Sequence, residues 1–415
     1  MRVSLTLHMR KKVNVDELIV GMYLERIDAS WIRNPFWRGS FVISDSKEID
    51  LIKASKIAEV WIDTSKGLDV AQQYGEFPKT MPAGLSELQP AVAIMPAQMG
   101  EELVRATRIC DQAKQAVTSM FLEARMGNTI DVDGAGQLVK NIFDSVSRNA
   151  SALISLARLK TADDYTYMHS VAVCALMIAL ARQLGLDEHQ ARAAGEAGLL
   201  HDMGKALIPM ELLNKPGKLT KEEYAIVRGH PELGHALLCK ASGVSDIALD
   251  VCLHHHERMD GAGYPMALRG DRISLFAKMG AVCDVYDAIT SNRPYKAGWD
   301  PAESVRKMGQ WAEGHFDPVV FQAFVRSLGI YPVGSLVRLN SGLLGVVILQ
   351  NPSALTMPVV KVFFSTKAGE RIEPAVLDLS ERHVREKIVA REDPAKWRFP
   401  DLNALWSAGE VNFFS

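Results

Sequence analysis

The sequence is poor in cysteine and lacks any long run of apolar residues. Its 415 residues include five cysteines, an odd number, and no two of them form a C-x-x-C pair. This argues against a disulfide framework and a zinc ribbon, and it favours a reducing compartment. The N-terminus is charged too early for a signal peptide, and no apolar segment approaches the ~20 residues that span a bilayer. We therefore expect a cytoplasmic protein that is not inserted in a membrane.

An excess of charge of either sign is also missing. The 47 lysines and arginines are nearly balanced by 49 aspartates and glutamates, which leaves a formal net charge of −2. Such a balance gives no support for binding to DNA, RNA or a membrane surface. The hydrophobic fraction of 48% and the charged fraction of 23% are those of a globular protein, and the length predicts more than one domain.

The chain is predicted to be a mainly α protein with four segments. A small α/β, β-rich accessory domain with a regulatory role spans 1–76, and a proline-containing linker spans 77–100. From 101 to 330, apolar residues recur every three or four positions, which predicts an all-α helical bundle. Over 331–415 the apolar pattern is that of short strands, which predicts a small C-terminal β appendage.

Histidine is unevenly distributed, and most of it falls in the predicted helical domain. Eight of the 11 histidines lie between His169 and His256. Buried histidine and aspartate are costly unless they are paired or bind a metal. Five predicted helices each offer such side chains to one interior point: His169, His201 with Asp202, His230, His255 with His256, and Asp284 with Asp287. This convergence predicts a metal centre.

The candidate ligands are imidazoles and carboxylates without sulfur. Such a set suits iron or manganese, and it also accepts nickel or zinc. Asp202 has two oxygens and can bridge two ions, as in two-metal phosphodiesterases and phosphatases. A pair of ions generates hydroxide at neutral pH and stabilises the attacking and leaving oxygens of an in-line displacement.

Two motifs give the sequence a specific resemblance. His169, His201-Asp202 and Asp284 match the H…HD…D pattern of the HD superfamily of metal-dependent phosphohydrolases. The stretch from His255 to Pro265 resembles the extended signature of the HD-GYP subfamily, and the likeness covers roughly residues 160–330. It implies a bacterial phosphodiesterase that converts cyclic di-GMP to pGpG, with GMP as the product of a second cut. Such an enzyme lowers the second-messenger signal that governs biofilm formation, motility and virulence.

The resemblance also implies which residues hold the metal ions. One ion would be bound by His169, His201, Asp202 and Asp284, and the second by Asp202, His230, His255 and His256. Some family members carry a glutamate four residues before the first histidine and bind a third metal. Tyr165 stands at that position here, so two divalent ions are expected and a third is not.

Further residues match family positions that contact the substrate. Lys205 follows the His-Asp pair and would assist at the phosphate, together with Asp202 as the catalytic pair. Tyr264, Arg293 and Lys296 would hold the cyclic dinucleotide. Asp287 would orient a ligand or a water without touching an ion.

Two alternatives compete with the enzyme hypothesis. A degenerate HD-GYP domain would sense cyclic di-GMP or dock a partner with little or no turnover. A different HD phosphohydrolase would act on another nucleotide. The retained His201, Asp202 and Asp284 count against the first, and the Gly261–Pro265 signature counts against the second. The expected partners are cyclic di-GMP and other signalling proteins such as diguanylate cyclases. The residues from 1 to 76 resemble the poorly characterised N-terminal domain of some HD-GYP proteins.

Overall fold

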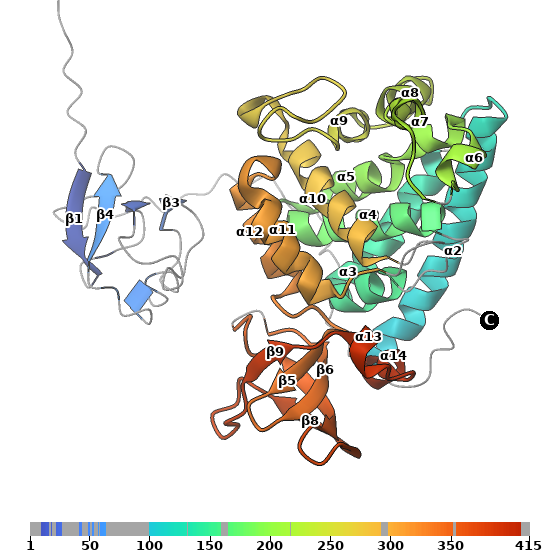
Figure 1. The fold of residues 1–415 in the computed structure, drawn as a ribbon. Helices are drawn as coiled ribbons and strands as arrows, with labels where there is room; N and C mark the ends of the chain where they lie inside the picture. Colours follow the sequence, from blue (N-terminus) through green and yellow to red (C-terminus); the bar gives the residue numbers. More distant parts are fainter. Residues whose placement is uncertain are drawn as a thin grey trace, which may run out of the picture. The chain divides into compact units, whose positions relative to one another are not determined.

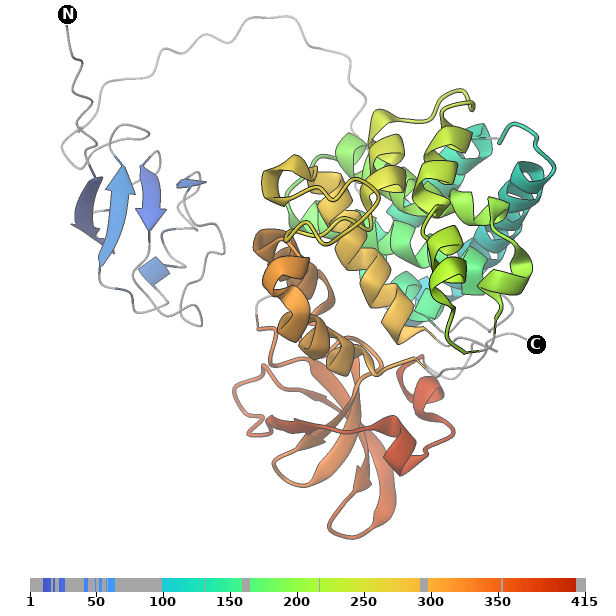
Figure 2. The same cartoon turned by 45° about the horizontal axis from the view of Figure 1, so that its top comes forward.

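The computed structural model forms two compact units, residues 1–91 and 92–415, which Figures 1 and 2 show in two views. The structure describes residues 10–15, 18, 22–26, 41–43, 49, 52–53, 57, 59–63, 99–130, 132–158, 165–215, 217–291, 298–351 and 354–407. Within these residues no helix is both long enough and apolar enough to cross a membrane.

The first unit contains a four-stranded sheet with the order β1-β4-β2-β3. Its strands are β1 (Arg10–Asn14), β2 (Tyr23–Arg26), β3 (Phe41–Val42) and β4 (Glu59–Asp63), and the neighbouring pairs are antiparallel. Alternation places Val13, Leu24, Val60 and Ile62 in one apolar core, as expected for a sheet with one buried face. The predicted β-rich character of this region is confirmed.

Four long helices form the frame of the second unit: α2 (Met99–Arg125), α3 (Val132–Arg158), α4 (Tyr165–Gln183) and α5 (Glu188–Leu200). Helix α4 contacts α2, α3, α5, α10 and α12. Its residues from Met168 to Ala181 are all buried, because small and apolar side chains occur on every face of the helix. This central helix carries His169 into the interior of the bundle.

Further helices surround this frame and provide the other candidate ligands. They are η2 (Met203–Leu207), α6 (Met210–Leu213), α7 (Lys221–Val227), α8 (His230–Leu238), α9 (Asp246–His254), η3 (Gly270–Arg272), α10 (Leu275–Thr290), α11 (Pro301–His315) and α12 (Pro318–Leu328). Side-chain caps fix where several helices of this unit begin: Asp187 caps α5, Thr220 caps α7, Ser245 caps α9 and Ser274 caps α10. The starts of these helices are therefore specified locally.

The C-terminal part of the second unit is an antiparallel sheet of five strands with the order β8-β7-β6-β5-β9. The elements are β5 (Leu336–Leu339), β6 (Leu343–Leu349), β7 (Val359–Ser365), β8 (Glu370–Asp378), β9 (Ile388–Arg391), α13 (Pro394–Trp397) and α14 (Leu402–Trp406). Trp406 and Leu344 belong to the same apolar core as the helices. Arg391 on β9 also lies 2.6 Å from Glu303 on α11, so the sheet packs on the bundle.

The predicted fold class, a mainly α protein with a small β-rich N-terminal domain and a C-terminal β appendage, is confirmed. The boundaries predicted at residues 76, 100 and 330 stay predictions. For comparison, α2 begins at Met99 and α12 ends at Leu328.

Candidate metal centre

The second unit brings histidines and aspartates from five helices to one interior point. His169 lies in α4, His201 and Asp202 follow α5, His230 begins α8, His255 and His256 follow α9, and Asp284 and Asp287 lie in α10. Most of these residues are almost completely buried, and the side chain of His256 is 22% exposed. Charged and polar groups buried to this extent need partners.

A close backbone approach places the His201-Asp202 turn beside α8. Gly204 lies in η2, directly after that turn, and a Cβ atom at this position would stand 1.9 Å from the carbonyl oxygen of His230. The same atom would stand 2.5 Å from the backbone nitrogen of Gly234. Only glycine allows the two backbones to come this close, and their contact brings Asp202 next to His230.

The first donor group consists of His169, His201 and Asp202, whose ligand atoms lie within 4.8 Å of one another. The Nε2 atoms of His169 and His201 are each 3.3 Å from Oδ2 of Asp202. Asp284 adjoins this group, since its Oδ1 lies 3.1 Å from Nε2 of His169. The four residues are those that the sequence predicts for one ion.

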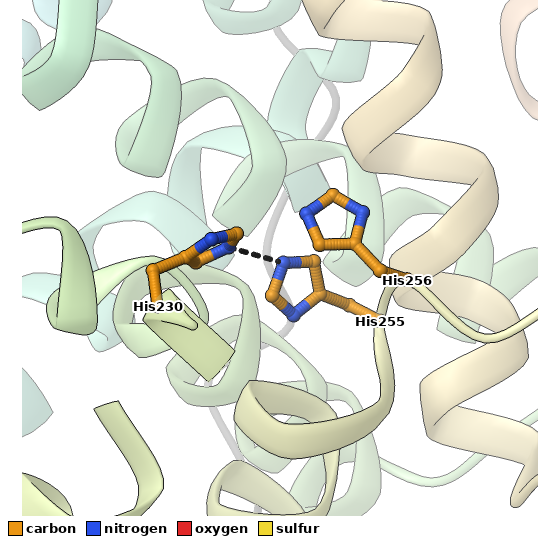
Figure 3. Close-up of side chains that lie close together, drawn as sticks. All are labelled: His230, His255 and His256. Carbon is orange, nitrogen blue, oxygen red and sulfur yellow. Dashed lines mark hydrogen bonds between the residues drawn. The ribbon is translucent and has the colours of Figure 1, made fainter. Parts of the chain in front are cut away.

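The second donor group consists of His230, His255 and His256, again with ligand atoms within 4.8 Å of one another. Figure 3 shows the three imidazoles gathered at one place, with Nε2 of His230 3.4 Å from Nε2 of His255. The other oxygen of Asp202, Oδ1, lies 3.1 Å from Nε2 of His230 and 3.8 Å from Nε2 of His255. The two oxygens of one carboxylate thus face two donor groups.

In three of the histidines, outer hydrogen bonds set which ring nitrogen can bind a metal. The Nδ1 atom of His201 lies 2.8 Å from the carbonyl oxygen of Gly198, and that of His230 lies 2.7 Å from the carbonyl oxygen of Val227. In His255, Nδ1 lies 3.0 Å from a carbonyl oxygen of α9. A carbonyl oxygen only accepts, so Nδ1 carries the proton and Nε2 keeps its lone pair for the centre.

The ionisation of the site favours cation binding. Burial lowers the pKa of His255 well below 6.5 and that of His256 to about 3, so both imidazoles are neutral at pH 7. Burial alone would raise the pKa of Asp202, but Lys205 and neighbouring histidines hold it well below 3.8. Burial would also lower the pKa of His169, yet hydrogen bonds to three aspartates raise it to about 10. The carboxylates therefore favour a positive charge here, and a divalent cation would compete with the proton.

Two buried ligand atoms give a direct test of whether these residues suit metal ions. Within the part of the chain that the structure describes, Nε2 of His201 and Oδ1 of Asp202 are buried and make no hydrogen bond. Leaving such an atom without a partner costs about 1–3 kcal/mol. Coordination to a cation would satisfy both atoms, and the nitrogen and oxygen donors are those of iron and manganese sites. The residues therefore fit divalent metal ions.

Lys205 and Asp287 lie against the donor groups from outside. The Nζ atom of Lys205 is 2.5 Å from Oδ2 of Asp202, and its side chain is 22% exposed. Oδ2 of Asp287 is 2.6 Å from Nδ1 of His169. His254, the first of the three consecutive histidines, pairs with Asp250 at 2.8 Å instead of joining either donor group.

The loop after His256 carries Tyr264 to the rim of the second donor group. The tyrosine ring stacks on the His256 imidazole, with centroids 4.7 Å apart and an interplanar angle of 26°. A Cβ atom on Gly263 would stand 2.6 Å from the carbonyl oxygen of His256, so this turn also requires glycine. Arg293 and Lys296, the other predicted substrate contacts, lie outside the described residues, as does the side chain of Tyr165.

Sequence reasoning did not identify two residues beside this loop. Glu257 is 2% exposed, and its carboxylate accepts hydrogen bonds from the backbone nitrogens of Met266 and Leu268 at 2.7 and 2.9 Å. Arg228 lies with its guanidinium carbon 4.4 Å from the centroid of the Tyr264 ring. An isolated acidic residue next to two histidines was the available signal for Glu257. No sequence pattern pointed to Arg228.

The fold and the site together define a class, the helical metal-binding domains with a His-Asp pair at a helix end. Comparison with family models agrees: a model described as "HD domain" matches residues 143–320, and a domain of unknown function, DUF3391, matches residues 10–135. The chain belongs to the HD-GYP subfamily of the HD superfamily, in the group that carries this N-terminal domain. The resemblance inferred from the sequence is confirmed.

Similar proteins support this assignment over nearly the whole chain. The sequence is 51% identical over 405 residues to the cyclic di-GMP phosphodiesterase PA4108 of Pseudomonas aeruginosa, with 96% of each chain covered. It is 32% identical over 248 residues to the cyclic di-GMP phosphodiesterase response regulator RpfG of Xanthomonas campestris, covering 55% of this chain and 65% of that one. A 3'3'-cGAMP-specific phosphodiesterase of Vibrio cholerae is 32% identical over 208 residues, covering 50% of this chain and 44% of that one.

Proposed function

We propose that this protein is a metal-dependent phosphodiesterase that hydrolyses cyclic di-GMP to linear pGpG. The observation that carries the proposal is the position of Asp202, whose two oxygens face the two donor groups at 3.1 and 3.3 Å. The relative that is 51% identical over 96% of its length is named for this reaction. Hydrolysis of the messenger lowers its level in the cell.

Two divalent ions are proposed for the site, iron or manganese in preference to nickel or zinc. When bound, they lower the pKa of water and stabilise charge on the oxygens of a phosphodiester. The residues proposed to hold one ion are His169, His201, Asp202 and Asp284. Those proposed for the other are Asp202, His230, His255 and His256. No third ion is proposed, because Tyr165 supplies no carboxylate at the position that some relatives use.

The surrounding side chains are proposed to hold the substrate in place. Lys205 is partly exposed, and its ammonium group lies beside Asp202. It can therefore form an ion pair with a phosphate oxygen of the bound substrate. Tyr264 lies at the rim of the site, stacked on His256, where its ring edge and hydroxyl can contact the dinucleotide. Arg293 and Lys296 are also proposed to bind phosphate, and this proposal rests only on their match to the family motif. Asp287 accepts a hydrogen bond from Nδ1–H of His169 and keeps that ring oriented toward the centre.

The N-terminal unit is proposed to regulate the enzyme or to contact other signalling proteins, such as diguanylate cyclases. This proposal rests on the separate core of that unit, which is built from its own strands. Removing residues 1–76 while keeping the rest of the chain tests it. Unchanged kinetics together with an unchanged oligomeric state would reject this role.

The proposed reaction is tested with full-length protein purified without oxygen and loaded with ferrous iron or manganese. Incubation with cyclic di-GMP is expected to release pGpG, and a chelator should stop the release until metal is added back. Later appearance of GMP would show the second cut. A fully metallated protein that binds cyclic di-GMP but forms no linear product would be a sensor, and the proposal would then be wrong.

A further inference from the structure

Arg228 lies at the rim of the metal centre. It contacts the ring of Tyr264, which is stacked on His256 of the second donor group. It caps the C-terminus of α7, two residues before His230 in the chain, and its side chain is exposed. Its guanidinium lies 4.4 Å from the Tyr264 ring and 5.9 Å from the Tyr224 ring. Stacking on aromatic rings holds a guanidinium flat and leaves its N–H groups available at the edges.

A single aromatic ring therefore contacts both Arg228 and a residue of the second donor group. The same Tyr264 ring that contacts Arg228 is stacked on His256 at 4.7 Å. Arg228 and Lys205 thus stand at different places around the donor groups, since Lys205 contacts Asp202 instead. A ligand bound at the metal centre would contact the positive side chain of Lys205 at one position and that of Arg228 at the other.

The charge of Arg228 is not neutralised by the protein around it. Among the described residues, no carboxylate comes within ion-pair distance of its guanidinium, in contrast to Arg258, which binds Asp260 at 2.7 Å. Tyr224 and Tyr264 contribute only the weak attraction of their π faces. An arginine held in place by aromatic rings and left without an anion is suited to bind an external anion in a bidentate way.

We propose that Arg228 binds the second phosphodiester of the cyclic dinucleotide, the one that is not cleaved. This inference rests on the proposed function. A cyclic dinucleotide has two phosphodiesters on opposite sides of one macrocycle, so only one can occupy the metal centre while the other extends toward the rim. The second phosphodiester carries a full negative charge, whereas the edges of the bases are neutral. The uncompensated charge of Arg228 therefore favours the phosphate over a base.

The test compares cyclic di-GMP with two compounds that contain one phosphodiester but lack the second. Bis(p-nitrophenyl) phosphate has one phosphodiester and no base, and the linear dinucleoside monophosphate GpG has one phosphodiester and two guanines. For Arg228→Ala, KM for cyclic di-GMP should rise about 10-fold or more, the size expected for a lost charge-assisted hydrogen bond. The change in kcat should be smaller. Turnover of bis(p-nitrophenyl) phosphate and inhibition by GpG should stay within about twofold of the wild type.

Conservative variants separate the charge from the shape of the side chain. Arg228→Lys keeps a positive charge and should recover part of the affinity, whereas Arg228→Gln keeps only neutral donors and should not. Lys221→Ala removes an exposed cation from the other end of the same short helix and serves as the matched control. Its KM for cyclic di-GMP should equal that of the wild type.

Several results would overturn the inference. A wild-type KM for Arg228→Ala would show that the side chain does not touch the substrate. Equal losses with bis(p-nitrophenyl) phosphate would indicate a damaged centre, and an equal loss with GpG would indicate recognition of guanine. Full recovery by Arg228→Gln would exclude a role for the charge. Failure of the wild type to cleave cyclic di-GMP, while it cleaves bis(p-nitrophenyl) phosphate, would instead reject the proposed function.

Discussion

Oδ1 of Asp202 lies 3.1 Å from Nε2 of His230, although the two residues come from different helices and are both buried. This close approach is not a hydrogen bond, since within the described residues the buried Oδ1 atom makes none. Such an approach of an oxygen and a nitrogen without a hydrogen bond is expected where both atoms are ligands of one cation. The relationship therefore supports a shared, bridging role for Asp202.

Removing this carboxylate should affect both donor groups together. In Asp202→Ala we expect the bound metal to fall well below two ions per chain. The turnover of cyclic di-GMP should fall by about 10³-fold or more, because metal ions supply several kcal/mol of transition-state stabilisation. Metal analysis and product chromatography on the same sample measure both effects. Glu222→Ala, an exposed change on α7, is the control, and full turnover in Asp202→Ala would show that the site is assigned wrongly.

Gly204 should be required for the geometry of the centre. A methyl group there would collide with the backbone of His230, and overpacking of this kind costs about 1–3 kcal/mol. We therefore expect Gly204→Ala to lower the melting temperature and to weaken metal binding.

Gly309 in α11 offers the matched control for this substitution. A Cβ atom at Gly309 would meet nothing closer than 3.8 Å, so Gly309→Ala should leave metal binding unchanged and should not lower stability. Equal behaviour of the two alanine variants in thermal unfolding and metal titration would refute the role given to the close approach at Gly204.

Asp287 should act on metal affinity through His169. Its Oδ2 lies 2.6 Å from Nδ1 of that ring, and loss of such an outer partner typically weakens metal binding 10–100-fold. Asp287→Ala should show a loss of that size in a metal titration. Asp287→Asn keeps an oxygen acceptor and should lose less.

The pair of Asp250 and His254 provides a control with the same chemistry. It is also an aspartate on Nδ1 of a histidine, at 2.8 Å, but His254 belongs to neither donor group. Asp250→Asn should therefore bind metal as the wild type does. If Asp250→Asn weakened metal binding as much as Asp287→Ala does, Asp287 would have no specific role in metal affinity.

A buried carboxylate far from the metal centre should make stability depend on pH. Glu102 in α2 accepts hydrogen bonds from Ser145 at 2.7 Å and from Arg148 at 2.7 and 2.9 Å. Burial alone would raise the pKa of Glu102, but these partners lower it below its ordinary value of 4.5. A lowered folded-state pKa means that the stabilisation is complete above about pH 4.5 and is lost as the pH falls toward the folded-state pKa.

Urea unfolding at pH 7 and at pH 4 measures this effect. Glu102→Gln should lower the free energy of unfolding at pH 7 by about 1–3 kcal/mol, the range for a charged hydrogen bond. The variant should also lose less stability than the wild type between the two pH values. An identical pH dependence of both proteins would show that Glu102 does not contribute to it.

Much of the candidate metal centre could be predicted, because its residues form motifs that are recognisable in the sequence. A His-Asp pair after an apolar helix, and histidines at the ends of two others, are hard to explain by packing. The structure explains why His255 and His256, but not His254, face the centre. Helix α9 ends at His254, and the two following residues turn inward at its cap.

Other features depend on contacts between distant segments and gave no sequence pattern. Arg228 meets Tyr264 only because α7 and the loop after α9 are brought together by the fold. In the C-terminal sheet, β5, β6 and β7 have apolar residues that predicted them. The strand β8 contains Pro374 and mostly exposed residues, so its sequence does not show an apolar strand pattern. An edge strand tolerates proline and has no apolar face to reveal it.

Hydrolysis is proposed to require two ions, held by the two donor groups that share Asp202. Titration of manganese into metal-free protein, with pGpG release measured at each ratio of metal to chain, tests it most directly. We expect pGpG formation to rise mainly between one and two ions per chain and to level off at two. Full activity at one ion per chain, or no pGpG at two, would contradict it.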